Sequence, residues 1–328
     1  MSTNHEPLNT LPRIGITVGD AAGIGPEIVL KTLSDETSRE TYKPVVICDE
    51  RFLRSQANAL GIELDAEIVD LQNLPDDVRP GEESAETGRA SGQYIEKAVE
   101  LWRNGTIDAI ATAPISKKAL NAGGYDFPGH TEFLAELTNT PEFAMSFFAD
   151  KLRVVLLSTH LPLIAAIDLV RKDALVELID FSNAQLSRLL RRQVKIAVAG
   201  LNPHASEGGM FGSQEAEEIS PAIDYCRTQL AIDVSGPYSP DTIFLRGYRG
   251  EFDAVIACYH DQATIAVKSL SFGSAVNVTL GLPLIRTSVD HGTAVDIAGK
   301  NIADASSMTA AVKLAAELAG MRQAAKHS

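Results

Sequence analysis

Short apolar runs alternate along the chain with longer amphipathic stretches. The runs are rich in Val, Ile and Ala and lie at residues 13–20, 43–50, 108–114, 153–160, 195–204 and 253–260. Continuous β-branched stretches of this length are typical of strands that are buried on both faces of a parallel sheet. The segments at 88–105 and 173–192 have the apolar spacing of helices that cover such a sheet. The alternation therefore predicts an α/β fold with a mainly parallel sheet.

The size of the chain predicts two lobes. It has 328 residues with 45% hydrophobic content, and a single core stops growing near about 250–300 residues. No low-complexity linker marks a boundary between lobes. We therefore treat residues 12–320 as one catalytic unit whose lobe boundary stays open, and we expect residues 1–11 and 321–328 to be flexible ends.

Charge and cysteine content narrow the function classes. A formal net charge of −14 disfavours nucleic-acid binding, which relies on clustered Lys and Arg. Three widely spaced cysteines fit a reducing compartment better than a disulfide framework. We find neither a signal-peptide pattern nor an apolar stretch of 18 residues. The expectation is a cytoplasmic protein that binds neither nucleic acid nor membranes.

Three histidines follow three of the strand-like runs. His160 ends one run, His204 follows "KIAVAGLNP" and His260 follows "DAVIACY". Because ligands gather at the carboxyl ends of parallel strands, three imidazoles delivered there can converge on one metal ion. The alternative for each histidine alone is an ordinary loop residue.

Two other groups of side chains are candidates for binding an anion. His130 and Thr131 stand between a Pro-Gly turn and a helical segment, where an imidazole and a hydroxyl can bind a carboxylate or phosphate; alternatively, Thr131 is the N-cap of that helix. Lys268, Asn277 and Arg286 recur at nine-residue intervals through an apolar region. A buried cation needs an anionic partner, which is either an internal carboxylate or a ligand phosphate.

A glycine-rich turn follows the first strand-like run. Gly19, Gly23 and Gly25 precede Pro26 at a helix start. Their spacing differs from the dinucleotide-binding G-x-G-x-x-G fingerprint. The turn either presents amides to a phosphate or is a plain tight turn, and any use of NAD requires another kind of site.

The motifs together resemble a known enzyme family. They are "TVGDAAGIGPE", "TAPISKKAL", "YDFPGHTE", "STHLPL", "GLNPHASEGG", "DTIF", "YHDQ" and "VNVTLGLPLIRTSVDHGTAVDIAGK". In this order, from about Ile14 to about Asp304, they are similar to the 4-hydroxythreonine-4-phosphate dehydrogenase family of vitamin B6 biosynthesis. The resemblance implies two α/β/α lobes like those of isocitrate and isopropylmalate dehydrogenases, with the active site in the cleft between them. It also implies a homodimer that uses NAD or NADP and one divalent metal ion (Zn, Mg or Co) per active site.

The resemblance also assigns residues. Metal ligands fall on His160, His204 and His260, shared across the dimer interface. Substrate contacts fall on His130, Thr131, Lys268, Asn277 and Arg286. Asp241 and Asp261 are candidates for orienting the metal ligands or for proton transfer; the alternatives are a helix cap for Asp241 and a loop hydrogen bond for Asp261. His291 and Asp290 are weaker candidates for the cofactor site, because either can simply brace a turn.

The reaction implied is the oxidation of 4-phosphohydroxy-L-threonine to 2-amino-3-oxo-4-phosphooxybutanoate, with decarboxylation to 3-amino-2-oxopropyl phosphate. A cation on the substrate hydroxyl lowers its pKa while hydride passes to the nicotinamide. Family relatives that act on 4-phospho-D-threonate or 4-phospho-D-erythronate are the nearest alternative, followed by cis-dihydrodiol dehydrogenases. From a different class, three histidines with a nearby Asp also suit a metal-dependent hydrolase, and a non-catalytic phospholigand-binding protein would tolerate loss of the histidines.

Overall fold

The computed structural model describes residues 11–35, 40–271 and 273–324. The chain forms two compact units. Unit 1 contains residues 1–141 and 282–328, and unit 2 is the continuous segment 142–281 inserted between them. The two segment junctions, after Pro141 and after Gly281, give the lobe boundary that the sequence left open.

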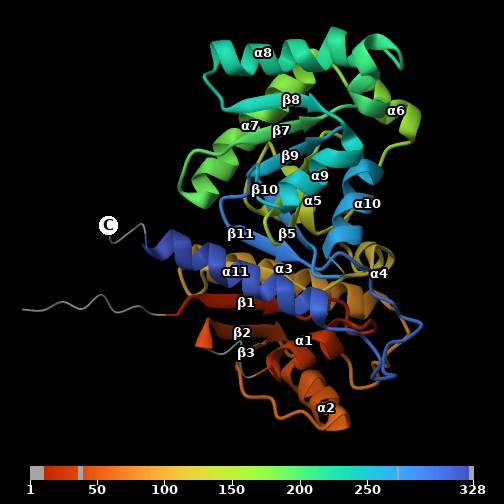
Figure 1. Ribbon diagram of the computed structural model, residues 1–328. Coiled ribbons are helices and arrows are strands. Elements are labelled where there is room, and N and C mark those ends of the chain that lie inside the picture. Colours follow the sequence, from red (N-terminus) through yellow and green to blue (C-terminus); the bar gives the residue numbers. More distant parts are fainter. Residues whose placement is uncertain (1–10, 36–39, 272, 325–328) are drawn as a thin grey trace, which may run out of the picture. The chain divides into compact units, whose positions relative to one another are not determined.

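Unit 1 is a parallel sheet between helices (Figure 1). Its strands lie in the order β3-β2-β1-β4-β11, and each neighbouring pair is parallel. The strands are β1 (Arg13–Thr17), β2 (Lys43–Cys48), β3 (Glu67–Asp70), β4 (Ala109–Thr112) and β11 (Ile285–Ser288). The helices are α1 (Gly25–Leu33), α2 (Glu50–Leu60), α3 (Ala85–Arg103), α4 (Lys117–Ala122), α5 (His130–Leu137) and α11 (Ser306–Ala324). In Figure 1, α11 and α3 cover opposite faces of these strands.

Local sequence explains where the unit 1 helices begin and end. Asp49 caps α2 by accepting a hydrogen bond from Phe52 N (3.0 Å), and Gly61 ends the helix at a φ of 66°. Ser84 begins α3 with a capping box. These residues supply the orphan amide and carbonyl groups at helix ends with partners.

The α3–α4 pair is closely packed. A Cβ on Gly88 of α3 would lie 1.8 Å from the backbone oxygen of Ala119 in α4. Only glycine permits this approach, so the position of α4 depends on the absence of a side chain at residue 88.

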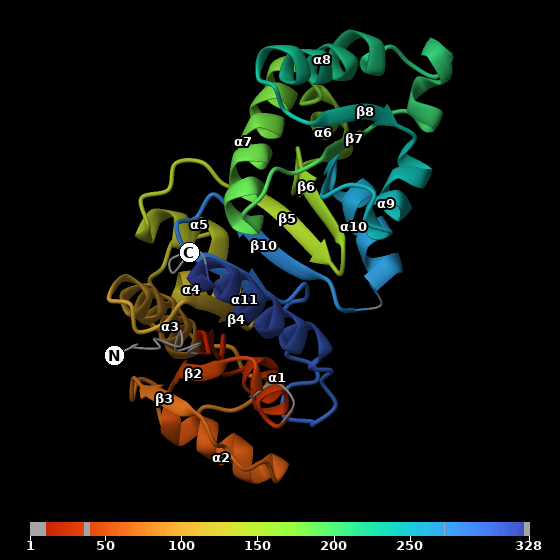
Figure 2. The same cartoon turned by 60° about the vertical axis from the view of Figure 1, so that its left-hand side comes forward.

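Unit 2 has a mixed sheet with the order β10-β5-β6-β9-β7-β8. The strands are β5 (Ala144–Ala149), β6 (Leu152–Leu156), β7 (Ile196–Ala199), β8 (Val234–Tyr238), β9 (Ala254–Ala257) and β10 (Val276–Leu280). The pairs β10–β5 and β5–β6 are antiparallel, and the remaining pairs are parallel. The helices are α6 (Leu163–Asp168), α7 (Lys172–Leu190), α8 (Ser220–Gln229), α9 (Pro240–Tyr248) and α10 (His260–Ser271). Figure 2 shows α7 on one side of these strands and α9 and α10 on the other.

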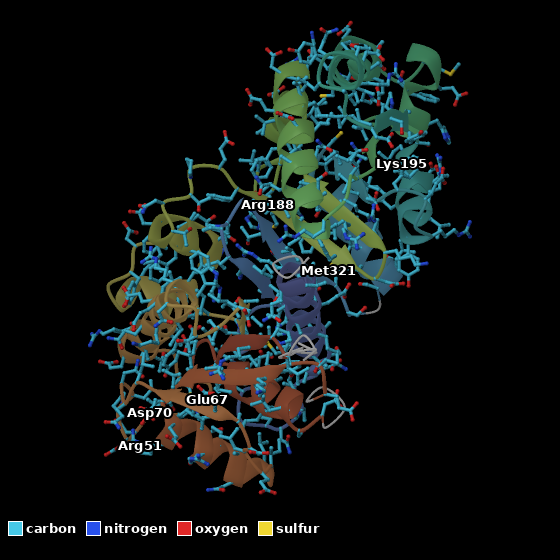
Figure 3. The ribbon with its side chains drawn as sticks, turned by 90° about the vertical axis from the view of Figure 1, so that its left-hand side faces the viewer. Arg51, Glu67, Asp70, Arg188, Lys195 and Met321 are labelled. Atoms are coloured by element: carbon cyan, nitrogen blue, oxygen red, sulfur yellow. The ribbon has the colours of Figure 1, made fainter. Side chains whose placement is uncertain are left out.

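The structure confirms the α/β prediction and the strand-like runs. All six runs contain strands, and the two predicted amphipathic segments correspond to α3 and α7. The edge strand β3 was not predicted; it is short, and its residues Glu67 and Asp70 are exposed (Figure 3). Charged residues on an edge strand hinder pairing with other chains.

The ends differ in part from the expectation. Helix α11 runs to Ala324, so residues 321–324 are helical where a flexible end was expected. Residues 1–10 and 325–328, the rest of that expectation, lie outside the described residues. Across the part of the chain that is described, no helix combines the length and the apolar character needed to cross a membrane.

Candidate active site

Unit 1 contains a cavity of about 190 Å³. The polar side chains that line it belong to Thr112, Lys117, His130, Arg286, Ser288 and His291. Among the described residues no Asp or Glu lines this cavity. The lining is therefore positive and rich in hydrogen-bond donors, which suits an anionic ligand.

The carboxyl ends of two adjacent strands form the floor of the cavity. β4 and β11 run parallel, with Arg286 opposite Ile110 and Ser288 opposite Thr112. Ligands bind at this end of the strands in open α/β sheets. Arg286 is only 3% exposed, and its Nη2 donates to the Thr112 hydroxyl at 2.9 Å.

Burial disfavours the charged form of two groups in the cavity, Arg286 and His130. It lowers the pKa of Arg286 to about 10, an effect that the carboxylate of Glu132 partly opposes. The pKa of His130 lies well below its ordinary value because the ring is desolvated and Arg286 is close. His130 is therefore neutral at pH 7. Its Nε2 is buried without a hydrogen-bond partner among the described residues, so it remains available to a ligand.

The structure corrects the alternative interpretation of Thr131. Helix α5 begins at His130, its N-cap is Gly129, and no side chain caps it. Thr131 is therefore not the N-cap. It lies half-buried in the first turn and, within the described part of the chain, is not among the residues that line the cavity.

The loop after β11 places His291 in the cavity and Asp290 outside it. His291 Nδ1 lies 3.0 Å from the carbonyl oxygen of Gly292, and His291 Nε2 is buried with no partner in the described residues. Asp290 instead accepts a hydrogen bond from the Ser307 hydroxyl at 3.2 Å, near the start of α11. The bracing role therefore fits Asp290, whereas His291 faces the cavity.

The glycines of the glycine-rich turn allow close packing of backbone segments. A Cβ on Gly19 would lie 2.1 Å from the Pro114 carbonyl oxygen, and one on Gly25 equally close to the Val18 oxygen. Amides in the turn already donate within the protein, as Asp20 N does to Pro114 O (3.0 Å) and Ile24 N to Thr293 O (2.9 Å). These internal contacts favour the plain tight turn over the phosphate-binding alternative.

In unit 2 the three strand-exit histidines follow adjacent parallel strands. His160 follows β6, His260 follows β9 and His204 follows β7, and β9 lies between the other two. The rings of His160 and His260 are 5.7 Å apart between centroids. Within the described residues, however, no three His, Cys, Asp or Glu side chains are grouped so as to hold a metal ion. One chain thus brings two of the predicted ligands together and leaves His204 apart from them.

His260 is held by its neighbour in the sequence. Its Nδ1 lies 2.9 Å from Asp261 Oδ1, an arrangement that fixes ring orientation and leaves Nε2 free to bind a metal. His260 begins α10 instead of standing in a loop. The donor set of imidazoles with a carboxylate behind one of them fits a divalent transition metal.

His204 lies in an unusual backbone segment. From His204 to Gly208 every residue has a positive φ, between 44° and 71°. Non-glycine residues in this left-handed region cost about 1–2 kcal/mol each. Such strain persists only where surrounding contacts hold it, and it concentrates at functional sites.

The remaining predicted residues of unit 2 lie on three elements. Asp241 is exposed in the first turn of α9 and accepts a hydrogen bond from the Ser239 hydroxyl at 2.5 Å. Lys268 is exposed on α10, so it is not the buried cation that the apolar region suggested. Asn277 is half-buried on β10, and its Oδ1 has no hydrogen-bond partner among the described residues.

Comparison with known proteins decides the family. The family model for pyridoxal phosphate biosynthetic protein PdxA matches residues 40–315. The chain belongs to the PdxA family.

Relatives of the PdxA family carry two different names. A D-threonate 4-phosphate dehydrogenase from Cupriavidus necator is 45% identical, over 95% of this chain and 98% of its own length. A 4-hydroxythreonine-4-phosphate dehydrogenase from Geobacter metallireducens is 42% identical, over 96% and 97% respectively. The crystal structure of a 4-hydroxythreonine-4-phosphate dehydrogenase from Burkholderia phymatum superposes with a TM-score of 0.83 at 44% identity, covering 94% of this chain and 98% of that one.

Membership of the PdxA family confirms the resemblance drawn from the sequence. The chain is an oxidoreductase of a dehydrogenase family, associated by name with pyridoxal phosphate biosynthesis. The hydrolase alternative is therefore set aside.

Sequence reasoning missed residues in the unit 1 cavity and in the histidine region of unit 2. Lys117 lines the unit 1 cavity, and its only signal was the lysine pair in "TAPISKKAL". In unit 2, Glu215 is 3% exposed and its Oε1 accepts hydrogen bonds from the amides of Leu201 (2.8 Å) and Asn202 (2.7 Å). It thereby anchors the loop that carries His204.

Gln262 was also missed. Its Oε1 accepts from Cys258 N (2.7 Å) and its Nε2 donates to the carbonyl oxygen of Gly200 (2.8 Å). This side chain joins the ends of β9 and β7, from which His260 and His204 emerge. No spacing in the sequence signals such a link.

Proposed function

We propose that this chain catalyses the metal-dependent, NAD(P)-linked oxidation and decarboxylation of a four-carbon, 4-phosphorylated hydroxy acid. The first candidate is 4-phosphohydroxy-L-threonine, which would be converted to 3-amino-2-oxopropyl phosphate. The observation that carries the proposal is the cationic cavity at the ends of β4 and β11, together with the PdxA family match. D-threonate 4-phosphate is the second candidate, because a relative with that name is 45% identical.

The groups in unit 1 would bind and orient the anionic end of the substrate. Arg286 supplies a buried guanidinium that can contact two oxygens at once. Neutral His130 can place a hydrogen bond through Nε2 without adding charge. Thr131, next to it on α5, would contribute its hydroxyl group.

The groups in unit 2 would serve the reacting carbon. His160, His204 and His260 would hold a divalent metal ion, and imidazole ligands fit zinc or cobalt better than magnesium, which prefers oxygen. Such a cation lowers the pKa of a substrate hydroxyl and stabilises the negative charge that develops as carbon dioxide leaves. Asp261 would orient His260, and exposed Asp241 would accept the hydroxyl proton. Lys268 and Asn277 would contact the substrate, since the Asn277 amide oxygen is buried and still needs a partner.

The hydride acceptor would be NAD or NADP. The chain has no dinucleotide fingerprint, so the nicotinamide nucleotide needs a site of another kind. His291 supports one in unit 1, because its buried Nε2 lacks a partner among the described residues and would hydrogen-bond a polar group of the nucleotide.

The assembly we propose is a homodimer with metal ligands contributed by both copies. Exposed apolar side chains lie within ten residues after two of the three histidines. After His160, α6 and its flanks expose Leu161, Leu163, Ile164, Ile167 and Leu169; after His204, Met210 and Phe211 are exposed. Apolar patches of this kind mark protein–protein contacts. Substitution Ile164→Glu, at a residue that is 79% exposed, should yield monomers in size-exclusion chromatography with light scattering, and an unchanged dimer would exclude this surface.

We place the enzyme in the cytoplasm. Its three cysteines, Cys48, Cys226 and Cys258, are free and buried. Buried thiols without disulfide partners fit a reducing compartment.

The decisive assay measures NADH or NADPH absorbance with both phosphorylated substrates, after chelation and after metal is restored. Metal-dependent turnover of 4-phosphohydroxy-L-threonine supports the first candidate, and a clear preference for D-threonate 4-phosphate supports the second. His204→Ala should abolish the metal-dependent rate while circular dichroism stays unchanged. Full activity of this variant would refute the metal assignment, and silence on both substrates would refute the proposed reaction.

A further inference from the structure

Two neighbouring lysines at the start of α4 differ in what they face. Lys117 and Lys118 are both exposed in the first turn of the helix. Lys117 lines the unit 1 cavity, and Lys118 does not. A positive charge in the first turn opposes the helix dipole, so helix stability does not explain a lysine at this position.

The fold fixes the place from which Lys117 projects. Ser116 caps α4 by accepting a hydrogen bond from Ala119 N at 3.2 Å. The close approach at Gly88 locks the same helix onto α3. The stem of Lys117 lies against the entry of α5, because its Cε would be 3.8 Å from a Cβ on Gly129. The far part of the Lys117 stem thus lies beside Gly129, which also lines the cavity.

The cavity around Lys117 has the composition of a phosphate site. Arg286 is buried in its wall, and the hydroxyl-bearing residues Thr112 and Ser288 stand at the ends of two adjacent strands. His130 adds a buried Nε2 that lacks a partner among the described residues. Arg286 already interacts with the carboxylate of Glu132, so its charge alone does not balance a doubly charged ligand. Lys117 is the other fully charged side chain in the lining and supplies the second positive charge that a phosphate dianion needs.

We propose that Lys117 is a specificity-determining residue that pairs with a phosphate dianion bound beside Arg286, and that it sets the preference for 4-phosphorylated substrates. This inference rests on the proposed function for the identity of the substrate. Binding of a phosphate anion at this site can be tested without knowing the rest of the substrate. Lysine acts on phosphate as a point charge, and arginine acts through its planar fork, so the two roles are complementary.

Inorganic phosphate is the probe for the site. Isothermal titration of the full-length protein should show that Lys117→Ala weakens phosphate binding at least tenfold, since a charge-assisted hydrogen bond is lost. Lys118→Ala is the matched control, because it removes the same charge one residue away on the same turn and should bind phosphate like the wild type. Lys117→Arg should restore most of the affinity. Equal affinity of the two alanine variants would overturn the inference.

A pH profile separates charge pairing from a structural role. A phosphate monoester gains its second charge near pH 6, and inorganic phosphate gains it about one pH unit higher. The affinity of the wild type for inorganic phosphate should therefore rise as pH increases from about 5.5 to about 8.5, and this rise should flatten in Lys117→Ala. If Lys117→Ala keeps the full increase of phosphate affinity with pH, Lys117 does not interact with the second negative charge of the phosphate.

Kinetics distinguish failure of this inference from failure of the proposed function. With active enzyme, Lys117→Ala should raise KM for the phosphorylated substrate tenfold or more and leave KM for NAD unchanged. An active variant with wild-type KM values refutes the role of Lys117 and leaves the dehydrogenase intact. Phosphate binding that depends on Lys117, in a protein that oxidises neither candidate substrate, supports the site and refutes the reaction.

Discussion

Replacing Arg286 by Met should stabilise the ligand-free protein. Burial lowers the pKa of this guanidinium from 12.5 to about 10. At about 1.36 kcal/mol for each pKa unit, the buried charge costs about 3 kcal/mol. The variant also loses the hydrogen bond between Arg286 and Thr112, which reduces the expected stabilisation by about 1 kcal/mol. The net expectation is an increase of about 2 kcal/mol in the free energy of unfolding of unit 1.

The folded and unfolded pKa values of Arg286 determine the pH range over which the burial cost is present. The group is protonated in both folded and unfolded states below pH 10, so the cost is constant from pH 6 to 9. It declines only above the folded pKa of about 10, where the folded protein releases the proton. The stability difference between Arg286→Met and the wild type should therefore not vary across the neutral range.

Urea unfolding followed by tryptophan fluorescence tests this prediction. The single tryptophan, Trp102, lies on α3 and reports on unit 1. Phosphate at 100 times its dissociation constant should add about 2.7 kcal/mol to the wild type and little to the variant, which reverses their order. Arg13→Met is the control, because this half-buried arginine of unit 1 forms an ion pair with Glu67 at 2.7 Å, and its removal should not stabilise the protein. An Arg286→Met protein that is folded but less stable than the wild type would refute the reasoning.

Three further predictions follow from contacts in the two units. Gly88→Ala should lower the stability of unit 1 by about 2–3 kcal/mol in urea unfolding, since its Cβ would meet the Ala119 backbone oxygen; an unchanged midpoint would contradict the α3–α4 packing. Asp253→Asn should cost about 1 kcal/mol at pH 7, because the Arg192 hydrogen bond lowers the pKa of Asp253. That stability is present above pH 4 and lost as pH falls below it, so wild type and variant should converge in acid unfolding. Glu215→Gln should accelerate limited proteolysis in the loop after β7, because a neutral amide accepts two backbone hydrogen bonds less strongly than a carboxylate; an unchanged cleavage rate would argue against its anchoring role.

The six strands that were predicted have a continuous apolar pattern, whereas β3, β5, β8, β10 and β11 were not predicted. Predicted strands such as β4 and β9 are buried throughout and consist of β-branched or small residues. Edge strand β3 has exposed residues at both ends and half-buried residues between them, and β8 contains Gly236 and Pro237, which normally weaken a strand. Local pattern identifies a strand only where burial on both faces forces the composition.

Some residues of the candidate sites could likewise be predicted from local sequence pattern, and others could not. His160, His204 and His260 were found because each follows a recognisable strand. Their mutual distances depend on loops such as the left-handed segment that begins at His204, which no periodicity predicts. Lys117 joins the cavity through helix packing at Gly88, a contact between distant parts of the chain. Residues selected by tertiary contact leave no local signal.

The interrupted course of unit 1 has a consequence for synthesis on the ribosome. β4 pairs on one side with β1 and on the other with β11, which is made only after unit 2 is complete. At about 5–20 residues per second, some seven to thirty seconds pass between the synthesis of Pro141 and that of Ser288 at the end of β11. During that interval the nascent unit 1 exposes an unpaired strand edge, while unit 2 already has its whole sequence. The later segment of the chain can therefore mature before the earlier one, and the unfinished half is where newly made protein depends on chaperones.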